Sequence, residues 1–309
     1  MMQRKLWGLV LAVGVSIGVV AACASPKDRT RGKPIDIASN FQFATSPSGR
    51  ALKLDLYTPK GFEARTGQRL PVVVWIHGGS WARGSEDRAN LSAVALAAEG
   101  VAVASISYSL AHEANFPVQL GEVRQALVWL DDNATKLGLD MDRMGIWGGS
   151  AGGQLALMAG LAYELEAGPK DWPRPRFIVN LFGVTDFPNL VEDCEAMENC
   201  ADRFGWGERT VANYIVCKAE APACQETARK ASPVAWIDAS DPPVLTQHGA
   251  LDNVVPPGQA KRLHQMLRKA GVQSQLSIIP DRKHGRLGQK AADEAMAYTR
   301  KHLGLTTDK

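Results

Sequence analysis

Apolar residues along the chain form short continuous runs separated by segments with helical periodicity. The runs at residues 70–76 (LPVVVWI) and 101–106 (VAVASI) are typical of strands buried on both faces of a parallel sheet. Residues 51–57 instead alternate, with leucines at every second position, which predicts an edge strand. Further strands are predicted over residues 143–147, 177–182, 243–247 and 273–279.

Helices are predicted between these strands. The spacing of Val123, Leu127, Leu130, Ala134 and Leu137 gives one apolar helix face. Strands that alternate with helices predict an α/β fold, a mostly parallel sheet covered by helices on both faces. Further helices are predicted over residues 88–99, 151–164, 257–270 and 287–302. Residues 187–232 break the alternation, and we interpret them as a cap insertion near the mouth of a site.

One serine, Ser150, lies among small residues in the sequence WGGSAGG. The pattern fits G-x-S-x-G, and it stands between a predicted strand and a predicted helix. Glycines on both sides leave room for the strained turn of a nucleophile elbow, which exposes the serine hydroxyl over a helix N-terminus. A flexible glycine-rich turn that holds an ordinary serine is the alternative interpretation.

A serine hydroxyl becomes a good nucleophile when a base takes its proton and an acid orients that base. The candidate base is His284, in the loop after the last predicted strand, with His112 as a weaker alternative. The candidate acid is Asp252, which follows the strand at residues 243–247. Asp186 also follows a strand, and we interpret it as a residue that supports the site or lines the substrate pocket.

The sequence HGGSW, which follows the first buried strand, is a candidate oxyanion loop. Its Gly78 and Gly79, together with Ala151 beside the nucleophile, could present backbone N–H groups to a developing oxyanion. His77 is interpreted as an anchor of this loop. Trp81 is interpreted either as a core residue or as a wall of the substrate pocket.

Several motifs together resemble those of the α/β-hydrolase esterases related to hormone-sensitive lipase. They are HGGSWARGS, WGGSAGGQLA, ASPVAWI, DPPVLTQHGALDNVVP and KHG, within residues 50–303. The nearest branch contains feruloyl-esterase-like and kynurenine-formamidase-like enzymes. The resemblance implies a triad of Ser150, Asp252 and His284. It also implies oxyanion donors at Gly78, Gly79 and Ala151. The serine in HGGS, where the family pattern has a third glycine, and the cap insertion depart from that pattern.

These motifs predict a serine hydrolase that cleaves a small-molecule or carbohydrate carboxylic ester through an acyl-enzyme. The expectation includes no metal and no organic cofactor. A formal net charge of +3 does not indicate a nucleic-acid surface. Two alternatives stay open. One is an amide hydrolase, either a formamidase or a peptidase, and the other is an inactive binding protein of the cell envelope.

The N-terminus has the features of a bacterial lipoprotein signal. Two basic residues precede an apolar stretch at residues 6–20, and the sequence VAAC resembles a lipobox ending at Cys23. We predict a signal peptide over residues 1–22, a tether over residues 23–40 and the hydrolase domain over residues 41–309. A lipid on Cys23 would anchor the protein to the envelope, with the outer membrane as the expected address. A plain signal peptide or membrane anchor is the alternative.

The predicted cap insertion contains the four other cysteines. In an exported protein they are expected to form disulfides, and we predict the nearest-neighbour pairs Cys194–Cys200 and Cys217–Cys224. A zinc site is the alternative, but the spacings do not match a C-x₂-C knuckle. The insertion is also predicted to place Phe187, Phe204 and Trp206 over Ser150 and to leave Glu192, Asp193 and Glu195 in water.

Overall fold

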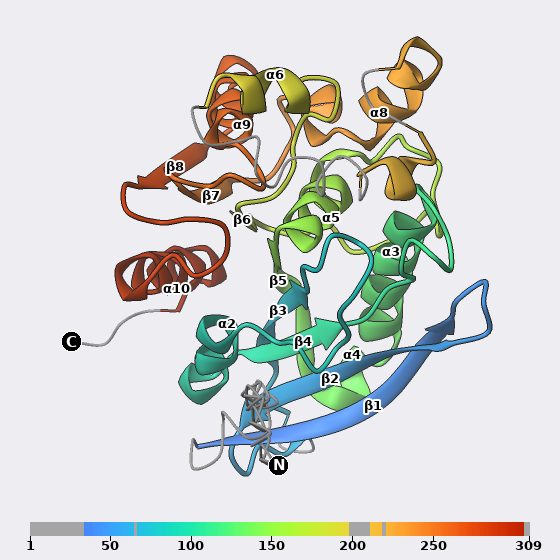
Figure 1. Cartoon of the computed structure of the whole chain (residues 1–309). Coiled ribbons are helices and arrows are strands. Elements are labelled where there is room, and N and C mark those ends of the chain that lie inside the picture. Colours follow the sequence, from blue (N-terminus) through green and yellow to red (C-terminus); the bar gives the residue numbers. More distant parts are fainter. Residues whose placement is uncertain (1–33, 65–66, 198–210, 218–220, 306–309) are drawn as a thin grey trace, which may run out of the picture.

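A computed structural model describes residues 34–64, 67–197, 211–217 and 221–305 (Figure 1). The predicted signal peptide, Cys23 and most of the predicted tether lie outside these residues. So do Cys200, Phe204 and Trp206 of the predicted cap. Within the described ranges, no helix combines the length and the apolar character needed to cross a membrane.

In the described part of the chain, eight strands form one sheet, in the spatial order β1-β2-β4-β3-β5-β6-β7-β8. β2 is antiparallel to its neighbours β1 and β4, and all other neighbouring pairs are parallel. The mostly parallel sheet is therefore confirmed. The strands are β1 (Ile35–Thr45), β2 (Ala51–Pro59), β3 (Leu70–Ile76), β4 (Ala102–Ile106), β5 (Leu139–Gly149), β6 (Ile178–Leu181), β7 (Val244–Gly249) and β8 (Ser274–Ile279).

Helices cover both faces of the sheet, as predicted. One face packs against α3, α5 and α9 through Leu120, Leu155 and Leu263, and the other packs against α2, η2 and α10 (Figure 1). The main helices are α3 (Val118–Asp132), α5 (Ala151–Leu161), α9 (Pro257–Lys269) and α10 (Gln289–Leu303). The shorter ones are α2 (Leu91–Ala95), η2 (Leu96–Glu99), α4 (Ala134–Leu137), α6 (Leu190–Glu195), η3 (Pro222–Cys224), α8 (Gln225–Ala231) and η4 (Pro233–Trp236).

Two predictions about the start of the domain are wrong. β2 is not an edge strand, because β1 pairs with it and forms the edge instead. β1 begins at Ile35, so the tether predicted over residues 23–40 ends earlier than the sequence indicated. The sequence of β1 contains no continuous apolar run, which agrees with its place at the edge of the sheet, where only Phe43 of its side chains is buried.

The insertion at residues 187–232 consists of short helical pieces that lie on the α5 side of the sheet (Figure 1). Residues 211–215 are helical, and a disulfide joins Cys217 to Cys224, which confirms that predicted pair. Cys194 is also disulfide-bonded, whereas its predicted partner Cys200 lies outside the described residues.

Candidate active site

Ser150 occupies the turn between the end of β5 and the start of α5, in a backbone conformation that few non-glycine residues adopt. Its φ is 56° and its ψ is −122°. A Cβ on Gly148 would lie 2.0 Å from the carbonyl oxygen of Gly152. A Cβ on Gly152 would lie 2.2 Å from the carbonyl oxygen of Ile76. Only glycine fits at both positions, which explains the pattern around the serine.

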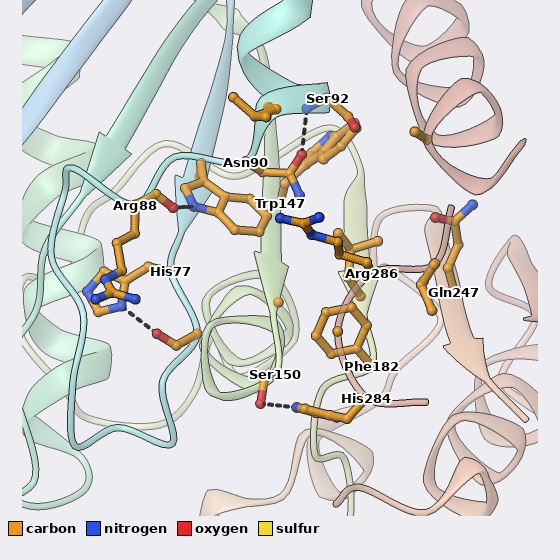
Figure 2. A pocket seen from close by; sticks show the side chains of 18 of the residues that line it. His77, Arg88, Asn90, Ser92, Trp147, Ser150, Phe182, Gln247, His284 and Arg286 are labelled. Carbon is orange, nitrogen blue, oxygen red and sulfur yellow. Dashed lines mark hydrogen bonds between the residues drawn. The ribbon is translucent and has the colours of Figure 1, made fainter. Parts of the chain in front are cut away.

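Ser150, His284 and Asp252 form one hydrogen-bonded series. The Nε2 of His284 lies 2.9 Å from the Oγ of Ser150 (Figure 2). Its Nδ1 lies 2.8 Å from Oδ2 of Asp252. His284 comes from the loop between β8 and α10, and Asp252 from the loop after β7. The carboxyl ends of parallel strands meet at one edge of the sheet. Ser150 and His284 therefore come together although they are 134 positions apart in the sequence.

Asp252 is fully buried, and its carboxylate has hydrogen-bond donors on both oxygens. Oδ1 accepts from the backbone N–H groups of Val254 and Val255, each at 2.9 Å. Oδ2 accepts from His284 and lies 3.2 Å from the Nε2 of His248. Burial alone would raise the pKa of Asp252, but the hydrogen bonds from the two histidines outweigh it and hold the pKa below its usual range.

The ionised carboxylate fixes the tautomer of His284. A carboxylate only accepts hydrogen bonds, so Nδ1 of His284 carries the proton that it donates to Asp252. In the neutral ring, Nε2 then has a free lone pair directed at the hydroxyl of Ser150. This arrangement suits a base that removes the proton from Ser150.

The three candidate oxyanion donors lie around the serine. Gly78 is so close that a Cβ there would lie 3.2 Å from the Cβ of Ser150, and Ala151 is the first residue of α5. Gly79 has a φ of 128°, and a Cβ there would lie 1.9 Å from the carbonyl oxygen of Arg83. The hydrogen bonds of the described residues leave the N–H groups of these three candidates without an acceptor. The N–H groups are therefore available to a ligand.

His77 anchors this loop from inside the protein. Its ring stacks on Tyr108 with 4.3 Å between ring centroids, and the Tyr108 hydroxyl donates to the His77 carbonyl oxygen at 3.0 Å. Its Nδ1 lies 2.9 Å from the carbonyl oxygen of Gly78. Burial lowers the pKa of His77 to about 4, so the ring is neutral at physiological pH and donates from Nδ1.

Trp81 belongs to the core and not to the described lining of the cavity at Ser150. Its ring stacks on Tyr214 of the insertion with centroids 4.3 Å apart and an interplanar angle of 6°. Its indole N–H donates to Oε1 of Gln154 at 3.1 Å. Phe187, predicted to lie over Ser150, is fully buried and packs against the same tryptophan. Of the two roles interpreted for Trp81, the structure therefore shows the core residue, whereas the position predicted for Phe187 is wrong, because contacts with Trp81 and Tyr214 bury its ring.

Asp186 also lies outside the described lining of that cavity. Its carboxylate is buried beside Arg262, with 3.3 Å between Oδ2 and Nε, and it accepts from Asn189 at 2.8 Å. Arg262 donates to both carboxylate oxygens of Asp193, at 2.6 and 2.8 Å, so Asp193 does not face water as predicted. Asp186 therefore ties the insertion to α9 and does not line the cavity, so its predicted place in the substrate pocket is wrong.

A cavity of about 1290 Å³ opens beside Ser150 and His284 (Figure 2). The partly exposed apolar side chains in its described lining include Leu91, Phe182 and Val254. The opening reaches the oxyanion loop on one side and the loop of His284 on the other. At this volume the cavity has room for a ligand larger than a small ester.

Sequence reasoning missed two residues that contact the hydrogen-bonded series. Phe182 follows β6 with a φ of 45°, and its ring lies edge-on to His284 with centroids 4.9 Å apart. His248 ends β7 and contacts Asp252, as described above. A signal was available for both, because each stands at the carboxyl end of a parallel strand. Among the described residues, no group of three or more His, Cys, Asp or Glu is arranged to hold a metal ion.

The chain was compared with the sequence models of known protein families, and one family matches the region that contains the nucleophile and the acid. The sequence model of the BD-FAE family matches residues 54–267, which include Ser150 and Asp252. The chain belongs to the BD-FAE family of α/β-hydrolase esterases. His284 lies beyond the matched residues, so its assignment rests on the geometry described above.

Several relatives and structural neighbours of this BD-FAE protein are named as esterases or ester hydrolases. It is 29% identical over 230 residues to esterase LipQ of Mycobacterium tuberculosis, covering 73% of this chain and 52% of LipQ. It is 29% identical over 262 residues to ethyl acetate hydrolase of Pseudomonas putida, covering 82% of this chain and 78% of that protein. The fold matches a truncated carbohydrate esterase from gut microbiota with a TM-score of 0.70 and 22% identity, covering 87% and 96% of the two chains. The chain spans about half the length of several curated relatives that it matches.

Proposed function

We propose that this BD-FAE protein is a serine hydrolase that cleaves carboxylic esters. The observation that carries the proposal is the series Ser150–His284–Asp252, with distances of 2.9 and 2.8 Å, beside an open cavity. A buried, ionised carboxylate, a histidine of fixed tautomer and a hydroxyl on a strained turn together make a strong nucleophile.

The reaction would proceed through an acyl-enzyme. As the Oγ of Ser150 attacks the ester carbonyl carbon, His284 Nε2 takes the hydroxyl proton, and Asp252 stabilises the imidazolium that results. The N–H groups of Gly78, Gly79 and Ala151 would donate to the oxyanion of the tetrahedral intermediate. His284 then gives its proton to the leaving alcohol. Water, activated by the same histidine, hydrolyses the acyl-serine and regenerates the free hydroxyl.

The names of the relatives support an ester as the substrate. Ethyl acetate hydrolase names a small neutral ester, and the structural neighbour is named a carbohydrate esterase. We therefore propose a small-molecule or carbohydrate ester for this chain. The two alternatives are an amide hydrolase and an inactive binding protein of the envelope. One experiment distinguishes both of them from an ester hydrolase.

The test compares the wild-type protein with Ser150→Ala and with Ser240→Ala, an exposed serine outside the cavity, as control. Wild type and the control should react with a fluorophosphonate probe and hydrolyse p-nitrophenyl esters. Ser150→Ala should lose labelling and up to about 10⁶ in kcat. Labelled protein that cleaves p-nitroanilides faster than esters would favour an amide hydrolase. An unlabelled, folded wild-type protein would contradict catalysis altogether.

We also propose that a lipid on Cys23 anchors the protein in the bacterial envelope, at the outer membrane of a two-membrane species. The support is the basic start, the apolar stretch and the VAAC sequence, with Ala24 instead of aspartate after the cysteine. In cells, Cys23→Ser should leave the protein unprocessed or release it from the membrane fraction. Wild-type protein without lipid by mass spectrometry would refute the anchor.

A further inference from the structure

The ring of Phe182 lies directly beside the reacting groups, although the proposed chemistry does not use it. Phe182 belongs to the described lining of the cavity, and its side chain is partly exposed. Figure 2 shows the ring next to the imidazole of His284. The two ring centroids are 4.9 Å apart, and the interplanar angle is 70°. The ring is therefore a wall of the space in which an ester would meet Ser150.

The same ring reaches the residue that precedes the nucleophile. A Cβ added to Gly149 would lie 3.6 Å from Cζ of Phe182 and 3.3 Å from Cη2 of Trp75. Both aromatic rings thus come within contact distance of one point on the cavity wall. Trp75 is only 6% exposed, and its indole N–H donates to the carbonyl oxygen of Arg88 at 2.9 Å. Of the two rings, that of Phe182 is therefore the more exposed to a ligand.

The backbone holds the ring of Phe182 in this place. Its φ is 45°, and its N–H donates to the carbonyl oxygen of Gln247 on β7 at 2.8 Å. A non-glycine residue keeps such a conformation only where the surrounding structure holds it. A shift of the chain that moved the ring aside would break this hydrogen bond. A bulky ester group therefore has to fit against the ring.

We propose that Phe182 determines the size of the group that an ester can place beside Ser150. This inference rests on the proposed ester hydrolysis and names a residue that selects its substrate. The whole cavity, at about 1290 Å³, does not impose the limit, so the wall nearest to the reacting groups does. In an apolar pocket, a single methylene that fits or fails to fit changes kcat/KM by about tenfold or more.

The test uses two series of esters that grow on one side only. p-Nitrophenyl acetate, butyrate, hexanoate and octanoate enlarge the acyl group, and ethyl, phenyl and 2-naphthyl acetate enlarge the alcohol. The enzymes are wild type, Phe182→Ala, Phe182→Leu, Phe182→Trp and the control Phe62→Ala. Phe62 is also a partly exposed phenylalanine that packs against the core, but it lies outside the described lining of the cavity.

For each ester, kcat/KM of the variant is divided by that of wild type, which cancels the reactivity of the ester. In at least one series, Phe182→Ala should raise this quotient about tenfold from the smallest to the largest ester. Phe182→Leu should change it less, and Phe182→Trp should lower it as the ester grows. Phe62→Ala should give the same quotient throughout. The series that responds identifies the side of the ester that faces Phe182.

The contact between Phe182 and His284 supplies the competing explanation. That contact is the same for every ester, so an effect through His284 would change all quotients alike. Quotients that fall equally for every ester would therefore overturn the proposal, as would a size dependence in Phe62→Ala as large as in Phe182→Ala. Thermal melts and fluorophosphonate labelling check that each variant is folded, and Phe182→Leu and Phe182→Trp decide the matter if Phe182→Ala is not.

Failure of this inference differs from failure of the proposed function. If esters are hydrolysed in a Ser150-dependent way while the quotients do not depend on size, only the role of Phe182 is refuted. If wild type hydrolyses no ester at all, the proposed function itself fails and takes this inference with it.

Discussion

Replacing His248 by leucine should lower both the stability of the fold and kcat, because this buried imidazole holds Asp252 and the loop behind it. Its Nε2 lies 2.8 Å from the carbonyl oxygen of Val255 and 3.2 Å from Oδ2 of Asp252. Both atoms only accept hydrogen bonds, so Nε2 carries a proton. Nδ1 is buried and has no hydrogen-bond partner in the described part of the chain, so the contacts of this ring are made through Nε2.

The contacts of His248 determine how much stability and activity His248→Leu should lose. Leucine would leave the buried carbonyl of Val255 without this donor and would remove one donor from a buried carboxylate, which together cost roughly 2–4 kcal/mol. The catalytic loss should be smaller than that of removing the acid. Asp252 keeps its two backbone donors and His284, so kcat should fall about tenfold, compared with about 10⁴ for an aspartate-to-asparagine change in a triad.

The assay combines urea unfolding with steady-state kinetics on a soluble ester. His248→Leu should shift the urea midpoint down by about 1 M or more. His248→Gln can keep a side-chain N–H near the position of Nε2, so it should recover part of both losses. The control is His264→Leu, a half-buried histidine on α9 whose Nδ1 lies 2.9 Å from the hydroxyl of Ser274.

The stability difference between wild type and His248→Leu should also depend on pH. The pKa of Asp252 is depressed in the fold, so its ionised form stabilises the protein above the unfolded pKa of about 3.9. That contribution is lost as the pH falls toward the folded pKa, and the difference should shrink below about pH 4. An unchanged midpoint and kcat, a glutamine variant no better than leucine, or an effect confined to KM would refute this reasoning.

Three further changes have defined outcomes. Gly152→Ala should prevent formation of the elbow, because its Cβ would lie 2.2 Å from the carbonyl oxygen of Ile76; soluble yield and fluorophosphonate labelling report this. Asp252→Asn should cost about 10⁴ in kcat, whereas Asp186→Asn should mainly lower Tm, and the reverse ranking would reassign the acid. Reduction of the Cys217–Cys224 disulfide should lower the free energy of unfolding by about 2–3 kcal/mol, because the unfolded loop is no longer restricted. Turnover of an acetyl ester should be preserved. Thermal melts and steady-state kinetics measure the two effects.

The sheet could be predicted well where its strands are buried on both faces. Residues 70–76 form β3 with the predicted bounds, because continuous apolar sequence can be buried in the middle of a parallel sheet. β1 was missed although Ile35, Ile37, Phe41 and Phe43 alternate along it. The register shifts between Ala38 and Phe41, and most of its side chains stay partly exposed, so the pattern is weak.

The candidate site was predicted where it depends on chain order and on the carboxyl ends of strands. The roles that the sequence left open or misplaced depend instead on contacts with residues far away in the chain. Trp81 is buried by Tyr214, more than a hundred positions later, and Asp186 is held by Arg262 on α9. A single sequence gives no sign of such partners, because neither residue type nor spacing says which side chain arrives from an insertion or from another helix.

The shape of the site also depends on backbone strain that the sheet maintains. Ser150 and Phe182 both have positive φ, at the ends of the neighbouring strands β5 and β6, and both contact His284. The N–H of Ser150 donates to the carbonyl of Leu181, and the N–H of Phe182 donates to that of Gln247, each at 2.8 Å. These bonds continue the hydrogen bonding of the parallel strands past their ends. They hold the serine and the phenylalanine in conformations that neither residue favours alone. The G-x-S-x-G sequence permits the elbow because its glycines leave the space, but the neighbouring strands are what keep it bent.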